Sequence, residues 1–82
     1  MNSYPKVKSV TIGAKKTIIV LFDNGISKIY DLKPLLDLDH FTALQNEGLF
    51  KTVKVDQGGH GISWNDQVDL SEAELWKNGL PT

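Results

Sequence analysis

The chain of 82 residues is long enough for one domain, and a domain of this size buries roughly 60–65% of its unfolded surface on folding. Hydrophobic residues make up 40% and charged residues 23%, which is the composition of a globular protein. A disordered chain is excluded, because such chains are more polar and more highly charged. The net charge of -1 leaves no positive surplus to displace counterions from a phosphate backbone, so nucleic-acid binding is disfavoured.

The chain contains no cysteine, which excludes disulfides, thiolate zinc sites and thiol nucleophiles. Its longest purely apolar run, residues 18–22, is far shorter than the roughly 20 residues of a membrane-spanning helix. Residues 1–5 lack the apolar core of a signal peptide. We therefore expect one cytoplasmic domain over residues 1–82, with no membrane contact.

Three strands are predicted in the first part of the chain. Residues 6–12 are rich in β-branched side chains and end at Gly13, as a strand does before a turn. Residues 17–22 are apolar at both parities, which predicts a central strand covered on both faces. Asn24 and Gly25 both tolerate positive φ and predict a two-residue type I′ turn, with the partner strand at residues 26–31.

The register of this hairpin follows from the turn. With Asn24 and Gly25 as its only turn residues, Ile19 lies opposite Tyr30. The hairpin then has two apolar faces, and the first carries Ile18, Val20, Phe22 and Ile29. The second carries Ile19, Leu21 and Tyr30. This second face requires a cover, which the C-terminal helix, a partner protein or a second copy of the chain would supply.

Short helical segments are predicted to follow the hairpin. Pro34 cannot continue a sheet but suits the first turn of a helix. Asp39 is a suitable N-cap for a second segment that runs from His40 to about Asn46, and Gly48 would end it.

Two further strands and a last helix are predicted beyond this point. Residues 50–55 alternate with a period of two, and Ile62 and Trp64 continue that parity after a glycine-rich stretch. Ser71 and Glu74 have the spacing of a capping box, in which each side chain bonds the other residue's free backbone N–H. The C-terminal helix should therefore run over residues 72–78 and end at Gly79.

The glycine-rich stretch at residues 56–61 admits three interpretations. His60 with Asp56 and Asp66 could coordinate a divalent ion, but a zinc site needs three or four ligands with imidazole or thiolate among them. A phosphate-binding loop needs a helix after its glycines, and a strand pattern follows here. Strands of matching parity on both sides favour the third interpretation, a hairpin loop with His60 at its tip.

Other candidate sites also have simpler explanations. His40 has no nucleophile or substrate motif beside it, so a surface position near a helix cap is favoured over a general base. Trp64 and Trp76 could stack on a ligand, but a small domain needs large side chains in its core. The aspartates occur at expected turns, caps and strand ends, where Asp bonds the local backbone. We therefore assign no catalytic residue, cofactor or metal.

Two stretches of the chain carry specific motifs, F-D-N-G at residues 22–25 followed by D-L-x-P-L-L at residues 31–36, and W-N-x-x-x-D-L at residues 64–70. In these motifs the chain resembles a bacterial family, domain of unknown function 2442. The chain departs from the family's usual residues at Asn65 and Gln67, which replace proline and glycine, and at Trp76, which replaces tyrosine. A turn and an aromatic residue are kept in these places, so neither departure threatens the fold. The resemblance covers nearly the whole chain.

The resemblance implies a role in a protein pair. Family members are often encoded beside a second small family, domain of unknown function 4160, in what looks like a toxin and antitoxin arrangement. We predict an α+β domain on a small, curved, mostly antiparallel sheet of about five strands, ordered strand, strand, strand, helix, strand, strand, helix.

The leading functional hypothesis is a non-catalytic interaction module that binds a small protein or itself, as an antitoxin-like partner of a neighbouring protein. The alternative is a DNA-associated regulator that acts as an oligomer. The net charge of -1 disfavours this alternative, because DNA-binding domains usually carry excess positive charge.

Overall fold

The computed structural model describes residues 4–82 and confirms an α+β fold built from antiparallel sheets and short helices. Its strands are β1 (Val7–Ile12), β2 (Thr17–Phe22), β3 (Ser27–Asp31), β4 (Lys54–Val55), β5 (Gly61–Asn65), β6 (Val68–Ser71) and β7 (Leu80–Pro81). Its α-helices are α1 (Glu47–Phe50) and α2 (Glu72–Asn78), and its 3₁₀ turns are η1 (Lys33–Leu35), η2 (Thr42–Gln45) and η3 (Gln57–Gly59). None of these helices is long and apolar enough to cross a membrane.

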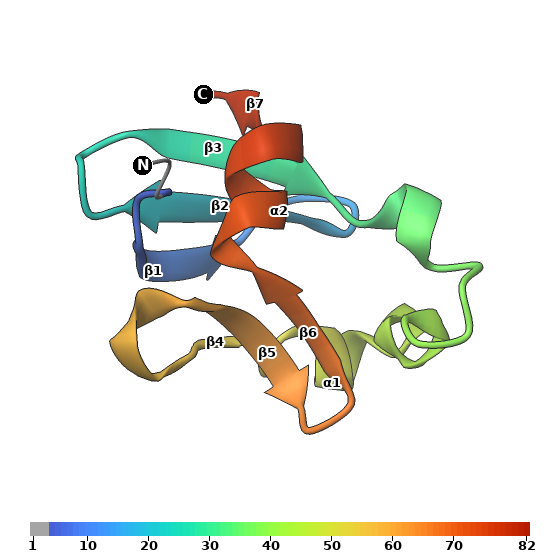
Figure 1. The fold of residues 1–82 in the computed structure, drawn as a ribbon. Coiled ribbons are helices and arrows are strands. Elements are labelled where there is room, and N and C mark those ends of the chain that lie inside the picture. Colours follow the sequence, from blue (N-terminus) through green and yellow to red (C-terminus); the bar gives the residue numbers. More distant parts are fainter. Residues whose placement is uncertain (1–3) are drawn as a thin grey trace.

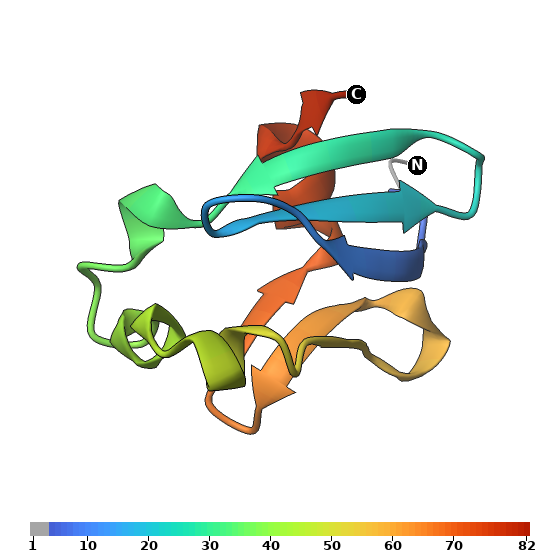
Figure 2. The ribbon, with the colours of Figure 1, turned by 180° about the vertical axis from the view of Figure 1, so that it is seen from behind.

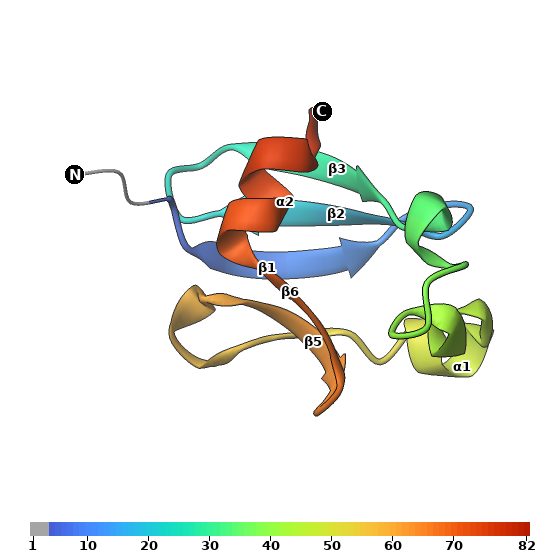
Figure 3. The ribbon, with the colours of Figure 1, turned by 45° about the vertical axis from the view of Figure 1, so that its right-hand side comes forward.

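The strands form two open sheets rather than the single sheet that we expected. The first has the order β1-β2-β3-β7 and the second the order β4-β5-β6, and all pairs are antiparallel. Figure 1 shows the second sheet below the first, with α2 in front of the first sheet. The rotated view in Figure 3 also places α2 across β1, β2 and β3. The core therefore lies between the two sheets and beneath α2.

The core is built from large apolar side chains of both sheets, of α2 and of the segment that connects the two sheets. Its fully buried members include Ile18, Val20, Phe22, Leu32, Leu44, Phe50, Ile62 and Leu75. Trp64 is also buried, and its indole Nε1 donates a hydrogen bond of 2.9 Å to the backbone oxygen of Phe50. The expectation that Trp64 fills the core is therefore confirmed, since its one polar atom has a buried partner.

The turn between β2 and β3 has three residues instead of two. The Phe22 amide donates to the Ile26 carbonyl at 2.9 Å, which leaves residues 23–25 in the loop. Gly25 has φ 88°, whereas Asn24 is not in the left-handed region. A type I′ turn would need positive φ at both residues, so this is a three-residue loop with glycine in its left-handed position.

The longer loop moves the register by one residue. Ile18 lies opposite Tyr30, and Ile19 lies opposite Ile29. Because strand side chains alternate between faces, a shift of one residue places Tyr30 on the core face and Ile29 on the opposite face. The predicted pairing of Ile19 with Tyr30 is therefore wrong. The C-terminal helix, one of the three predicted covers, does not cover the face that carries Ile19, since Ile19 is exposed.

The segment between the sheets differs from its predicted form. The predicted helix over residues 40–46 is replaced by η2 and then α1, and the Asn46 side chain accepts a hydrogen bond from the Leu49 amide at 3.0 Å. This cap starts α1, so Gly48 lies within a helix instead of ending one. Because α1 continues to the buried Phe50, the predicted strand over residues 50–55 is shortened to β4.

The C-terminal helix has the predicted limits. The Ser71 hydroxyl accepts a hydrogen bond from the Glu74 amide at 3.1 Å, as the capping box predicts. The Glu74 carboxylate does not return to Ser71, because it accepts a hydrogen bond of 2.7 Å from the Tyr30 hydroxyl. The Trp76 ring meets Phe22 edge to face, with centroids 5.1 Å apart. These contacts dock α2 on the core face of the first sheet.

Candidate interaction surface

The outward face of the first sheet carries a row of exposed apolar side chains. Ile19 of β2 lies opposite Ile29 of β3, and Ile29 lies opposite Leu80 of β7. Ile19 and Ile29 are each 36% exposed and Leu80 is 68% exposed. Leu21 is partly buried and projects from the same face, two residues from Ile19. We call these four residues, Ile19, Leu21, Ile29 and Leu80, the outer face.

Small polar side chains surround the outer face. The cross-strand register places five of them on the same side of the sheet, namely Ser9, Thr11, Thr17, Ser27 and Asp31. Asp31 is the one charged residue in this set. Seen from behind in Figure 2, the first sheet has no helix of the described chain across it. An apolar centre with a polar rim is typical of protein interaction sites.

Tyr30, which we predicted as part of this surface, lies on the other side of the sheet. Only 5% of it is exposed, and its hydroxyl donates to the Glu74 carboxylate. Burial and the bond to Glu74 raise the pKa of Tyr30 far above its ordinary value, so the phenol stays neutral. The structure therefore keeps Ile19 and Leu21 together, separates them from Tyr30, and adds Ile29 and Leu80.

The sequence contains a signal that could have placed Ile29 correctly. Asp23-Asn24-Gly25 suits a three-residue loop with its glycine in the left-handed position as well as it suits a two-residue turn. Leu80 had no comparable signal, because it reaches the outer face only through the pairing of β7 with β3.

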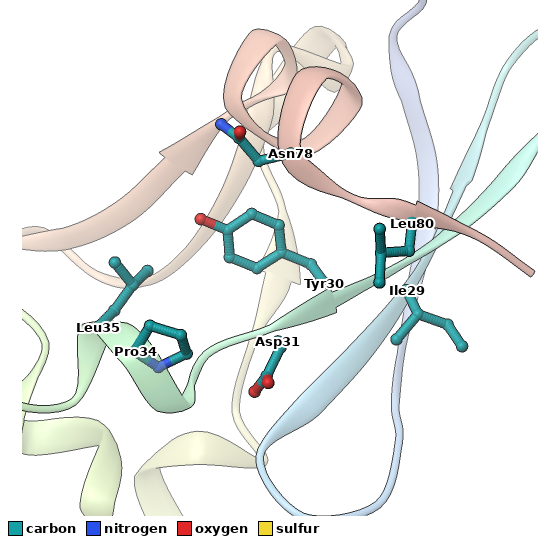
Figure 4. Close-up of a pocket in the computed structure, with 7 residues that line it drawn as sticks. All are labelled: Ile29, Tyr30, Asp31, Pro34, Leu35, Asn78 and Leu80. Atoms are coloured by element: carbon teal, nitrogen blue, oxygen red, sulfur yellow. The ribbon is translucent and has the colours of Figure 1, made fainter.

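A shallow hollow of about 250 Å³ lies at the edge of β3, next to the outer face. Figure 4 shows its lining residues, which are Ile29, Tyr30, Asp31, Pro34, Leu35, Asn78 and Leu80. Ile29 and Leu80 belong to both the hollow and the outer face. The hollow therefore extends the apolar surface beyond the end of β7, toward η1.

The glycine-rich stretch forms a hairpin loop, as predicted. The Asp56 amide donates to the Gly61 carbonyl at 2.9 Å and closes the loop between β4 and β5. Gly59 is buried with φ 74°, and a Cβ atom there would lie 2.6 Å from the Val7 carbonyl oxygen. The glycine therefore allows the loop to pack closely against β1.

His60 is exposed at the end of this loop. Its Nδ1 atom lies 3.4 Å from Glu72 Oε2, which Lys6 Nζ contacts at 2.9 Å. The Lys6 bond, with a smaller contribution from His60, lowers the pKa of Glu72. Asp56, a proposed companion of His60, instead accepts a hydrogen bond of 2.6 Å from Ser63. Within residues 4–82, no three acidic, histidine or cysteine side chains meet as a metal site would require.

The ion pair of Lys6 and Glu72 connects the segment before β1 to the start of α2. Since only 15% of the Glu72 side chain is exposed, water screens this pair less than a surface pair.

The structure also places the other candidate residues. His40 is exposed on the segment between η1 and η2, as predicted. Trp76 is half-buried, and Lys28 Nζ lies 3.9 Å from the centroid of its ring. One face of the Trp76 ring therefore makes a cation–π contact within the chain and is not free to stack on a ligand.

The two open sheets and α2 define a small α+β domain with one uncovered apolar sheet face. The chain belongs to the family described as "Protein of unknown function (DUF2442)", whose model matches residues 7–81. No curated protein and no solved structure matches the chain.

Proposed function

We propose that this protein is a non-catalytic interaction module that binds another protein through its outer face. The main support for this proposal is the aligned row of Ile19, Ile29 and Leu80, which runs across three strands and is exposed. Removing apolar surface from water stabilises a complex by about 25 cal/mol for each Å² buried. An exposed apolar row with a polar rim therefore favours association over chemistry at this face.

We further propose that the bound protein is a toxin-like partner, so that this chain has an antitoxin-like role in the cytoplasm. It is supported by the gene arrangement that the family resemblance implies, in which a second small protein is encoded alongside. A chain with no cysteine suits a reducing compartment. The binding role itself does not depend on this assignment, because the outer face is a physical property of the fold.

The proposal is tested by co-purification of the tagged protein from its native cells. We expect one small protein to be recovered in a fixed ratio with the wild-type chain. Ile29→Glu should abolish that recovery, because it introduces a charge at the centre of the outer face. Circular dichroism should show that the variant remains folded, since Ile29 makes no part of the buried core.

Ile26→Glu is the matched control. Ile26 is 45% exposed, but it pairs with Phe22 and therefore projects toward the opposite side of the sheet from Ile29. It should leave the recovered protein unchanged. Equal loss in both variants, or equal retention, would contradict the assignment of the outer face. Recovery of DNA in place of a protein would support the alternative of an oligomeric DNA-associated regulator.

A further inference from the structure

We propose that the outer face binds a second copy of this chain, so that two four-stranded sheets pack face to face about a two-fold axis. This inference rests on the proposed function in one respect, because it uses the same face. It goes further by identifying the occupant. Three properties of the face support a second copy: its cross-strand pattern, its charge and its size.

The cross-strand pattern is self-complementary. A two-fold axis that runs parallel to β2 and β3, midway between them, places each β2 residue over its β3 partner in the other copy. Ile19 then lies over Ile29 of the second copy, and Ile29 lies over the second copy's Ile19. Leu21 lies over the small side chain of Ser27, so the largest groups do not collide. The apolar centre of one copy therefore meets the apolar centre of the other.

The charge of the face also fits a second copy. Among the five polar residues around the outer face, only Asp31 is charged, and it pairs with Thr17 across the strands, so in the dimer Asp31 lies over a threonine of the second copy. With strands about 4.8 Å apart and sheets about 10 Å apart, the two Asp31 residues are separated by about 11 Å. Physiological salt screens repulsion over that distance. A strongly charged partner would find few complementary charges here, whereas a second copy brings only one further carboxylate to the interface.

The size of the face predicts a weak dimer. About five residues on each of β1, β2 and β3 and two on β7, at about 4.8 Å by 3.4 Å each, give a flat footprint of about 280 Å². The two copies together bury about 560 Å² of flat footprint, and protruding side chains add to this, so the total falls in the range below about 1,200 Å² that is typical of weak, transient complexes. We therefore expect a dissociation constant on the order of 100 μM.

Sedimentation equilibrium of the purified 82-residue chain tests the inference. The average mass of the wild type should rise from the monomer value of 9.1 kDa toward twice that value as concentration increases from about 10 μM to about 1 mM. Ile29→Glu should stay monomeric at every concentration. Ile26→Glu should dimerise like the wild type, because its side chain projects from the other side of the sheet.

Ser27→Val provides a test in the opposite direction. Each copy would place the new methyl groups against Leu21 of the other copy, so one substitution adds two apolar contacts. The dissociation constant should fall by about fivefold or more. A dimer weakened by Ser27→Val, or one that survives Ile29→Glu, would overturn the proposed geometry.

The possible failures remain distinguishable. A wild-type chain that stays monomeric at the highest concentration, yet recovers a different protein through Ile29, overturns the second-copy inference and leaves the proposed function intact. A monomer that recovers no protein overturns both.

Discussion

The glycine-rich loop offers the sharpest test of the fold, through a comparison of Gly59→Ala with Gly25→Ala. Both glycines have positive φ, 74° and 88° respectively. They differ in their surroundings, because a Cβ atom at Gly59 would lie 2.6 Å from the Val7 oxygen, whereas one at Gly25 would have no atom within 4 Å. The pair therefore separates backbone strain from close packing.

The magnitudes can be worked out from these surroundings. A left-handed conformation disfavours alanine by about 1–2 kcal/mol, partly offset by about 0.4–1 kcal/mol from the reduced freedom of the unfolded chain. Gly25→Ala should therefore reduce the free energy of unfolding by about 1 kcal/mol. At Gly59 the backbone of β1 must also move, which adds about 1–3 kcal/mol as overpacking does elsewhere. The total is about 2–4 kcal/mol, out of roughly 4–12 kcal/mol for a domain of this length.

Urea unfolding, followed by the fluorescence of Trp64 and Trp76, measures both effects, since unfolding exposes both rings to water. In thermal melts Gly59→Ala should lower the midpoint by about 10–25 °C, and Gly25→Ala by about 4–8 °C. The reasoning is refuted if Gly59→Ala is no more destabilising than Gly25→Ala, because the contact with β1 would then contribute nothing.

Three further predictions concern α2 and its contacts. Ser71→Ala removes the acceptor of the Glu74 amide and should lower the free energy of unfolding by about 1 kcal/mol in urea titrations, while an unchanged midpoint would show that the cap is dispensable. Tyr30→Phe removes the donor to the Glu74 carboxylate and should destabilise the fold by about 1–3 kcal/mol, measured in the same way, and a more stable variant would contradict this. The lowered pKa of Glu72 predicts a stabilising contribution that is fully present above the ordinary glutamate value of 4.5 and is lost as pH falls through the folded value. The urea midpoint of the wild type should therefore fall below that pH, and Glu72→Gln should flatten the fall, since it removes the titrating partner of Lys6. Equal acid sensitivity in both proteins would exclude this ion pair as the cause.

Several elements could be predicted because their signals are local. The α2 limits follow from Ser71 at the N-cap and Gly79 after the last turn, and the structure has the same limits. The loop between β4 and β5 follows from its glycines, two of which have positive φ. In each case the residues that decide the conformation are neighbours in the sequence.

Other elements were missed because their signals are weak or distant. β6 has only four residues, and its turn depends on the Asn65 side chain, which accepts hydrogen bonds from the Gln67 and Val68 amides. β7 has two residues and exists only because the end of α2 brings it to β3. The division into two sheets likewise depends on which strands meet in space.

The sequence by itself determined the α+β class, the limits of α2, and the presence of a hairpin at residues 17–31, since periodicity, caps and turn residues act over short distances. The tertiary structure decided which side chains share a face. One extra loop residue turned Tyr30 into the core and Ile29 outward, and the docking of the C-terminus added Leu80 beside it. Register and strand partners depend on hydrogen bonds between segments far apart in the chain, and they created the outer face on which the proposed function rests.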